Sequence, residues 1–552
     1  MSWYRLCIAD GPTNLFSVWI LAAIVIALLS WTGAACGASK DADIVFEAEM
    51  KMDLGQDVGQ DFGSLFEVKD ESGRVIIGAG FASVYNTRYR NDRYNLQFYI
   101  RPETDGDQYA VEPIGRMNDD IGGAYMFDLN DKAYAWSLAA GRPFQYFDTK
   151  MGLWQADEII DPEKLGFGDG VMWVADGLLV FDRTGAYHKG KQILAAPEAG
   201  QYYCFYYSHG HLIFYCTRPG AEEEGRTSLY ACPWTPSQQT PIDLSEAKTL
   251  RLKYSGETPF AFGQLRKEVV TCSNLGGFYA FDGTAWKVVR PSLRGVSYQV
   301  YTMVNYYGRL LTGQYPTGNL IEYDGYSLTH LPDAPPVMEG VAGYSRECQT
   351  AGIYRGELYV GVWPWAELWR LDADTGQWSF VQRMFSQPEL TAEFGHPYEE
   401  DIVAYTKATG EEIVFNTWGQ RITGMASVGP DMILSTSAKG ASARDTRLSF
   451  LTDEVFDEYG QFYRLHLPGN LAASIAPVSG PTQLRLVLRK NRMEIYRDGK
   501  LLAQTAVPTE LVTQLRPATI AWRYGVFGPF RGSLTQRSIS PAVEAVRPQR
   551  EN

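Results

Sequence analysis

One short pattern recurs along the chain: an aromatic or leucine residue, an aspartate, a tight turn and a second aromatic residue. A strand that ends on an aromatic residue and turns at an aspartate predicts a β-hairpin, because the aspartate side chain accepts hydrogen bonds from the backbone of its own turn. The aspartates of the five clear copies are Asp148, Asp182, Asp282, Asp324 and Asp372, which are 34, 100, 42 and 48 residues apart. Two further candidates, residues 229–234 and 415–418, bring the count to seven copies.

Repeats of about 40 to 50 residues, each with four short strands, are the sequence signature of β-propellers. The pattern resembles that of Kelch-like β-propeller repeat proteins and predicts a propeller with six or seven blades over residues 109–440. Ring closure usually needs strands from both ends of the repeat region in one blade, and residues 432–435 are the candidate for the closing strand. We expect no long amphipathic helix in this region.

The two ends of the chain, residues 41–108 and 441–545, also read as β-strands but do not fit the repeat. Asp498-Gly499 is a hairpin signal, and residues 484–503 around it resemble the central hairpin of concanavalin-like and laminin-G-like sandwiches. The first end is small for an independent domain. We therefore expect an all-β protein in which both ends form one concanavalin-like β-sandwich around an inserted propeller. The alternative is two independent β-appendages.

Residues 1–36 read as a targeting segment. The run 15–31 is apolar and uncharged, and small residues then lead to Cys36. This resembles a bacterial secretory signal with a lipoprotein cleavage site, in which Cys36 would be acylated, although Gly33 stands where lipoproteins usually have leucine. Three alternatives stay open: a lipoprotein, a cleaved and released protein, or an uncleaved membrane anchor. All three predict an exported protein, anchored to a membrane, at the cell surface or in the periplasm.

Charge and motif content exclude several function classes. Fifty basic against 64 acidic residues give a net charge of −14, which argues against a nucleic-acid partner. No Gly-rich phosphate loop is present, and we expect no cofactor. The pair His209 and His211 and the calcium-like start at Asp372 and Asp374 are more simply explained as turns, so we expect no metal site.

The cysteines allow two readings. Cys204 and Cys216 flank a predicted hairpin that turns at Gly210, where they would lie opposite one another. An oxidising compartment would permit a disulfide between them. The alternative is that they are buried free thiols.

A pair of carboxylates suggests one enzymatic alternative. Asn118-Asp119 and Glu347-Cys348 resemble, in their order, the nucleophile and acid motifs of secreted fructosidases and invertases, which combine a propeller with a concanavalin-like sandwich. Asp120 departs from that pattern, which has proline at this position. The resemblance implies Asp119 and Glu347 as candidate catalytic residues of a glycoside hydrolase.

Aromatic residues are the candidates for a binding site. Trp363, Trp365 and Tyr206 have side chains that either stack on a sugar ring or a peptide, or fill the spaces between blades. The sequence therefore predicts an exported binding or scaffold protein that holds a glycan or protein partner on a propeller face. The alternative is a secreted glycoside hydrolase, and the sequence leaves open whether the protein is an enzyme.

The targeting interpretation predicts the outcome of one substitution. Because acylation needs the thiol, Cys36→Ala should move the protein from the membrane fraction to the soluble fraction when cells are lysed and fractionated. An unchanged membrane fraction would instead favour residues 15–31 as an uncleaved anchor. A soluble wild-type protein would exclude both forms of anchoring.

Overall fold

The computed structural model describes residues 43–53, 64–82, 84–86, 95–101, 110–119, 121–129, 131–137, 144–149, 151–156, 170–174, 177–218, 227–238, 240–441, 443–475, 481–516, 519–521 and 533–539. The chain divides into two units, Met1–Ile44 and Val45–Asn552, and nearly all described residues belong to the second. Cys36 and the apolar run before it lie outside the described residues. Within the described part of the chain, no helix has the length and apolar character needed to cross a membrane.

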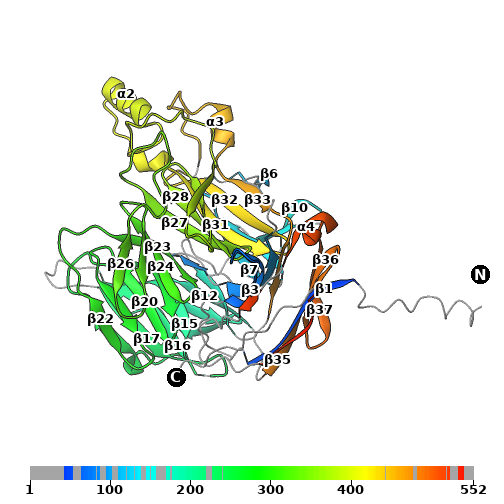
Figure 1. Ribbon diagram of the computed structural model, residues 1–552. Coiled ribbons are helices and arrows are strands. Elements are labelled where there is room, and N and C mark those ends of the chain that lie inside the picture. The colour runs from blue at the N-terminus through cyan, green and yellow to red at the C-terminus, as the bar shows by residue number, and fades with distance from the viewer. Residues whose placement is uncertain are drawn as a thin grey trace, which may run out of the picture. The chain divides into compact units, whose positions relative to one another are not determined.

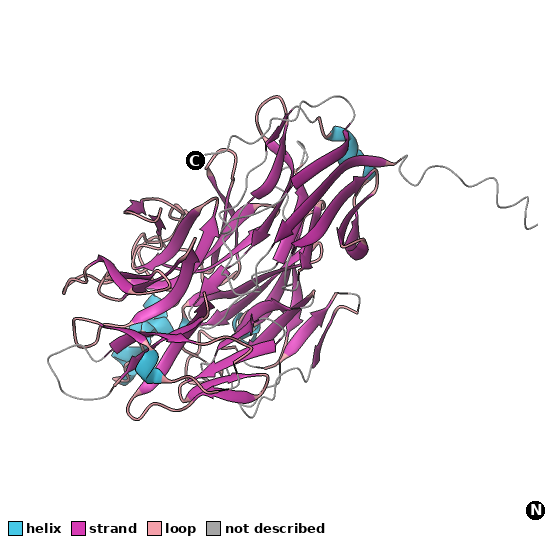
Figure 2. Cartoon of the chain, turned by 90° about the horizontal axis from the view of Figure 1, so that it is seen from below, coloured by secondary structure: helices cyan, strands magenta, loops and turns pink. Residues whose placement is uncertain are grey.

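The second unit consists mainly of antiparallel β-strands (Figure 2). Seven of its sheets follow one another along the chain, and we number them sheets 1 to 7. Sheet 1 consists of β7 (Ala124–Leu129), β8 (Lys132–Ser137), β9 (Gln145–Asp148) and β10 (Leu153–Ala156), and sheet 2 of β11 (Gly170–Val174), β12 (Gly177–Asp182), β13 (Gly185–His188) and β14 (Lys191–Leu194). Sheet 3 consists of β15 (Gln201–Ser208), β16 (His211–Thr217), β17 (Thr227–Pro233) and β18 (Lys248–Arg251). Sheet 4 consists of β19 (Pro259–Leu265), β20 (Glu268–Ser273), β21 (Phe278–Phe281) and β22 (Trp286–Arg290). Sheet 5 consists of β23 (Gln299–Tyr306), β24 (Arg309–Tyr315), β25 (Leu320–Tyr323) and β26 (Leu328–Leu331), together with β4 (Val84–Asn86). Sheet 6 consists of β27 (Glu347–Tyr354), β28 (Glu357–Trp363), β29 (Glu367–Leu371) and β30 (Trp378–Arg383). Sheet 7 consists of β31 (Gln420–Val428), β32 (Asp431–Ala438) and β33 (Gln461–His466), together with β6 (Ala110–Arg116).

The first strands of neighbouring sheets contact one another. Contacts join β11 to β15, β15 to β19, β19 to β23, β23 to β27 and β27 to β31. Sheet 7 then contacts sheet 1 through β31 and β7, and Val171 of sheet 2 shares an apolar cluster with Phe127 and Tyr134 of sheet 1. The seven sheets therefore pack in a closed cycle.

Sheet 7 combines strands from both ends of the cycle. β6, which precedes sheet 1, pairs with β33 in a register that runs from Gln461 opposite Arg116 to His466 opposite Ala110. Residues 432–435, expected as the closing strand, lie in β32 of this sheet, and the strand contributed from the other end is β6. β6 was not identified from the sequence because Pro113 and its exposed positions are typical of an edge strand.

The two ends of the chain share two five-stranded sheets. One has the order β37 (Lys500–Ala506), β36 (Arg492–Arg497), β35 (Pro481–Arg489), β1 (Ile44–Asp53), β39 (Ser533–Ile539); the other has the order β34 (Asn470–Ser474), β5 (Asn95–Ile100), β3 (Val75–Ala82), β2 (Ser64–Lys69), β38 (Thr519–Ala521). Phe46 and Phe98 from the N-terminal end and Leu486 and Ile495 from the C-terminal end lie in one buried cluster. This cluster excludes water from the space where the two ends meet.

Polar side chains of β5 bond to residues near the ends of three first strands, β27, β31 and β7. Gln97 Nε2 donates to the carbonyl of Ile353 (2.6 Å), and Asn95 Nδ2 donates to the carbonyl of Ser427 and to Asp128 Oδ2 (both 3.0 Å). These bonds satisfy buried amide groups. They also attach the terminal sheets to sheets 1, 6 and 7.

Short helices interrupt the pattern of strands. α2 (Glu399–Thr409) and η3 (Phe415–Trp418) lie between β30 and β31, and α3 (Asp453–Asp457) lies between β32 and β33. Figure 1 shows α2 and α3 close together. The expectation that 415–418 is a repeat copy was wrong: it is the turn of 3-10 helix η3, and Trp418 packs there against Tyr459. The region also contains the 11-residue helix α2, which the sequence analysis did not predict. Among the described residues, the remaining short helices are η2 (Leu244–Glu246) and α4 (Thr509–Gln514).

The aspartate turns are confirmed at all five clear copies. Each side chain accepts a backbone N–H from two or three residues further on: Asp148 from Met151 (3.1 Å), Asp182 from Thr184 (2.6 Å), Asp282 from Thr284 (2.8 Å), Asp324 from Tyr326 (2.7 Å) and Asp372 from Asp374 (2.8 Å). Four of these turns join the third and fourth strands of a sheet, whereas Asp182 joins the second and third strands of sheet 2. This different position explains the short 34-residue interval before Asp182.

The disulfide expected between Cys204 and Cys216 is not formed, and both residues are free thiols. The register places Tyr202, not Cys204, opposite Cys216, and it contains a β-bulge between Tyr203 and Phe205. The expectation assumed a regular hairpin. A turn centred on Gly210 would oppose Cys204 and Cys216, but Ser208 pairs with His211, so even an uninterrupted ladder would place Cys204 opposite Tyr215. The bulge in β15 shifts the register by one more residue in the same direction.

The aspartate turns predict a specific stability effect. Asp282 accepts bonds from Thr284 Oγ1 and from the backbone of Thr284 and Ala285, and the bond from the Thr284 side chain lowers the pKa of Asp282 most. Asp282→Ala should lower the free energy of unfolding by about 1 kcal/mol at pH 7, measured by denaturant titration. Asp282→Asn keeps the acceptor oxygen and should cost less. Because the folded-state pKa is depressed, the contribution is present at neutral pH and is lost as the pH falls through that pKa, so a difference that grows in acid would contradict the prediction.

Candidate functional site

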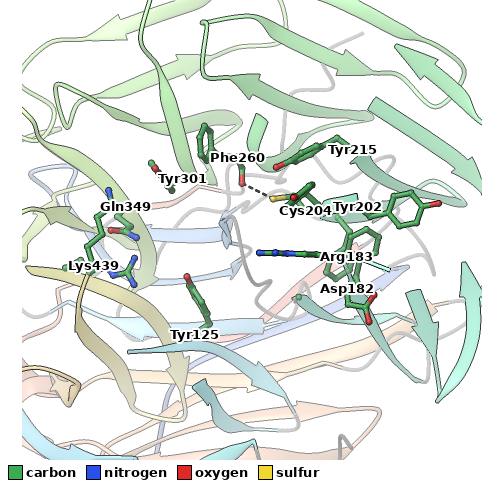
Figure 3. Close-up of a pocket in the computed structure, with 15 residues that line it drawn as sticks. Tyr125, Asp182, Arg183, Tyr202, Cys204, Tyr215, Phe260, Tyr301, Gln349 and Lys439 are labelled. Atoms are coloured by element: carbon green, nitrogen blue, oxygen red, sulfur yellow. Dashed lines mark hydrogen bonds between the residues drawn. The ribbon is translucent and has the colours of Figure 1, made fainter. Parts of the chain in front are cut away.

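A cavity of about 370 Å³ lies where the first strands of the seven sheets begin (Figure 3). Each of the seven first strands contributes to its wall: Tyr125 from β7, Gly170 from β11, Cys204 from β15, Phe260 from β19, Tyr301 from β23, Gln349 from β27 and Arg421 from β31. Every first strand supplies a residue near its start. The wall therefore lies on one face of the closed cycle of sheets, the face at which the first strands begin. This volume lies within the range of small-molecule sites.

Repeated β-bulges place several of these side chains. The ladder between first and second strands is shifted between Tyr203 and Phe205, between Val300 and Thr302, and between Cys348 and Thr350. The extra residues are Cys204, Tyr301 and Gln349, and all three line the cavity. Sheets 4 and 7 contain similar shifts in their first strands. A bulge redirects a side chain that a regular strand would point elsewhere, so the repeated bulge is a means of building this wall.

Aromatic side chains form one part of the wall. Tyr203 and Tyr215 stack with ring centroids 5.3 Å apart, and Phe260 and Tyr301 lie 5.1 Å apart. The Tyr301 hydroxyl donates to Gln299 Oε1 (2.5 Å). Burial, followed by the nearby Glu347 carboxylate, raises the pKa of Tyr301, so its phenol is neutral at physiological pH.

A buried arginine forms part of the polar side of the wall. Only 6% of the Arg421 surface is exposed. Its Nε donates to Ser437 Oγ (2.6 Å), and one terminal nitrogen donates to the carbonyl of Gly122 (3.3 Å). The Gln349 amide is assigned from its hydrogen bonds: its oxygen accepts from Arg421 (3.1 Å), and its nitrogen donates to Glu347 Oε1 (3.2 Å). Arg421 is therefore held in place by neutral acceptors.

Lys439 lies beside Arg421 in the wall and forms an ion pair. Its Nζ is 2.5 Å from Oε2 of Glu347, whose side chain is fully buried. The ammonium group also lies 4.0 Å from the ring centre of Trp363 and 5.3 Å from that of Tyr301. The aromatic faces and the carboxylate together stabilise the cation in a partly desolvated position.

A third cation comes from the aspartate turn of sheet 2. Asp182 accepts from the N–H and the hydroxyl of Thr184 (2.6 and 2.7 Å), which fixes the turn that carries Arg183. The Arg183 guanidinium is 5.6 Å from the ring centre of Tyr203. In Figure 3 it extends into the cavity from the side opposite Lys439 and Gln349.

The two candidate catalytic carboxylates do not line the cavity. Asp119 is exposed in the connection between β6 and β7. Glu347 begins β27 and lies behind the wall, where it pairs with Lys439. The structure therefore does not bring Asp119 and Glu347 together in the cavity wall, and Glu347 is buried as the partner of a cation.

The aromatic residues proposed for binding occupy the interior. Trp363 and Trp365 are 1% exposed and Tyr206 is fully buried, where its hydroxyl donates to Gln264 Oε1 (3.0 Å). Of the two readings, filling space between sheets fits their burial, and direct stacking on a ligand does not. Trp363 affects the cavity only from behind, through its contact with Lys439.

No group of three or more metal-ligating side chains occurs among the described residues. His211 Nδ1 lies 2.8 Å from the carbonyl of His209 at the turn of sheet 3. Asp372 accepts backbone bonds within its own turn. Both candidates thus act as turn residues.

No motif in the sequence marks the residues that line the cavity as a site. Tyr125, Tyr301, Gln349 and Arg421 all lie within the first three residues of a first strand. Aligning the repeats by the starts of their first strands would have collected these positions. Lys439 offered no such signal, because it follows β32 in a connection that is particular to sheet 7.

Comparison with known proteins finds similar solved structures, but no matching family model or curated protein. Similar solved structures include BamB from Moraxella catarrhalis (10% identity, TM-score 0.31, covering 69% of this chain and 90% of that one) and Saccharomyces cerevisiae Sqt1 (9%, 0.32, 82% and 100%). YCF48 bound to D1 peptide is another (12%, 0.29, 60% and 98%). These three proteins are β-propellers.

The buried ion pair in the wall predicts a double-mutant result. Lys439→Met should destabilise the protein by about 3 kcal/mol, because it leaves Glu347 buried without its cation. Adding Glu347→Gln should recover much of this loss, as measured by chemical denaturation. Arg309→Met, which removes the more exposed pair with Glu322, serves as the control and should cost about 1 kcal/mol or less. If the double variant is no more stable than Lys439→Met, the broken ion pair is not the cause of the lost stability.

Proposed function

We propose that this protein is a seven-bladed β-propeller with a concanavalin-like β-sandwich, and that it acts by binding. Sheets 1 to 7 would be the blades, with β6 completing the last, and the two terminal five-stranded sheets would be the sandwich. The observation that carries the binding role is the cavity to which all seven first strands contribute. A site with convergent polar groups among aromatic side chains is typical of ligand recognition.

The chemistry of the wall favours binding over glycoside hydrolysis. Hydrolysis by the usual route needs an acid and a second carboxylate on either side of one bond. The carboxylate in the wall, Asp182, accepts hydrogen bonds within its own turn, and Glu347 is paired with Lys439. We therefore propose a scaffold or binding protein that holds part of a glycan or protein partner in the cavity.

We also propose that the protein acts outside the cytoplasm. The apolar run 15–31 and Cys36 favour export, followed by anchoring through a lipid or through the segment itself. An exported protein would present the cavity to extracellular or periplasmic partners.

Cys204 provides a direct test of the cavity. It is partly exposed in the wall, whereas Cys216, Cys232, Cys272 and Cys348 are buried. Labelling Cys204 with a bulky maleimide should abolish binding to ligands found on glycan and peptide arrays. Those ligands should in turn slow the labelling, as followed by mass spectrometry.

The control is a cysteine placed away from the cavity. Lys500→Cys introduces an exposed thiol on β37, whose labelling rate should not respond to the ligands. Ligands that bind equally well after Cys204 is labelled would place the binding site elsewhere and overturn the proposal.

A further inference from the structure

Arg421 is a buried cation for which no counter-ion is present among the described residues. Its hydrogen-bond acceptors are a hydroxyl, a backbone carbonyl and the amide of Gln349, all of them neutral. A guanidinium group has five N–H donors, so these bonds leave donors unused. A buried charge is costly unless it is paired. An anion in the cavity would supply the missing partner.

The charge of the cavity wall also favours an anionic ligand. Arg183, Arg421 and Lys439 line the cavity with Asp182, and Lys439 is neutralised by Glu347 behind it. Asp182 uses its Oδ1 to hold the turn at Thr184. The wall therefore has a net positive charge in a protein whose net charge is −14, and a local field of this kind selects anionic ligands.

The rest of the wall suits a ring with apolar faces and polar edges. Tyr125, Tyr203, Phe260 and Tyr301 offer aromatic faces, and Gln349 offers an amide between them. Aromatic faces pack against the C–H faces of sugars, while amide and guanidinium groups bond to hydroxyl and carboxylate oxygens.

We propose that the cavity binds a uronic acid residue of an acidic glycan, with the sugar carboxylate as the counter-ion of Arg421. This inference rests on the proposed binding function and specifies its ligand. A planar guanidinium fork matches a carboxylate better than a lysine does, which explains why an arginine occupies the buried position. Arg183, on the exposed side, attracts the acidic chain.

A sugar fits this site better than an extended peptide. Extended peptides commonly bind by adding a strand to a free sheet edge. The first strand of sheet 5 already pairs with β4, with Asn86 opposite Thr302, next to the cavity residue Tyr301. The cavity volume of about 370 Å³ corresponds to a compact group rather than to a length of chain.

The test is isothermal titration calorimetry of the full-length protein with three probes: trigalacturonic acid, its fully methyl-esterified form and tetraglutamate. Trigalacturonic acid should bind tightest, and esterification, which removes the charge, should weaken binding about 10- to 100-fold. Arg421→Gln should weaken trigalacturonate binding by a similar factor and should leave binding of the methyl ester almost unchanged. Arg421→Lys should restore only part of the loss, because it keeps the charge without the fork.

Two further variants keep the test decisive. Lys500→Gln removes one exposed positive charge from β37 and should not change binding. Because Arg421 is buried, melting curves must show that its variants fold. If they do not, the exposed Arg183→Gln replaces them and should weaken trigalacturonate binding about threefold or more at low salt, with the difference shrinking as salt is added.

Equal affinity for trigalacturonic acid and its ester would overturn the inference. Tighter binding of tetraglutamate would overturn it in favour of an acidic peptide and leave the proposed binding function intact. If none of the probes binds while other array ligands protect Cys204 from labelling, the uronate assignment fails and the binding function stands. If no ligand protects Cys204 either, both proposals fail.

Discussion

The hydrogen bonds between β6 and β33 are the constraint on which the rest of this structure depends. Without β6, sheet 7 would end at β33 with an unpaired edge. The first and last sheets would then be joined by packing of β31 against β7 and by isolated hydrogen bonds such as that from Ser435 Oγ to the carbonyl of Ala124 (2.8 Å), without a strand ladder. With β6 in place, a strand that leads directly into sheet 1 is hydrogen-bonded into sheet 7. This fixes the seven first strands with respect to one another, and a cavity lined by all seven depends on that arrangement.

The cavity illustrates how a repeated fold makes a site that is not repeated. The same backbone irregularity, a bulge near the start of the first strand, occurs in five successive sheets. The backbone provides equivalent positions, and the sequence places different side chains there, such as Cys204, Tyr301 and Gln349. Charge then enters through less regular parts of the chain: Arg183 from a turn and Lys439 from a long connection. Architecture and specificity are thus encoded by different residues.

The sequence predicted those features that depend on local chemistry. The aspartate turns form as expected because side chain and backbone lie only two or three residues apart, so the surrounding fold hardly affects the bond. The shared terminal sheets followed from strand patterns at the two ends. The disulfide prediction was wrong because pairing depends on register: the turn pairs Ser208 with His211, and the bulge at Cys204 then shifts the ladder further. Glu347 was chosen for its resemblance to a motif, and Trp363 and Trp365 for residue type. Their roles depend on burial and on Lys439, which lies 92 residues from Glu347. Tertiary contacts of that kind leave no local pattern.

The pairing of the two ends of the chain also constrains the order in which this protein can fold. Glu47 and Arg485 form an ion pair across 438 residues, and β1 lies in the same sheet as β35. The N-terminal strands must therefore wait, without their partners, while the entire cycle of sheets is synthesised. The great length of this loop adds little to the entropy cost of closing it, because that cost grows only with the logarithm of loop length. Contacts between residues so far apart in the sequence nevertheless form slowly. During that delay β1 and β5 are apolar strands with open edges, the state in which chains aggregate. If the protein is exported as we propose and crosses a membrane unfolded, it would thus depend on chaperones until the partner strands β34 and β35 arrive.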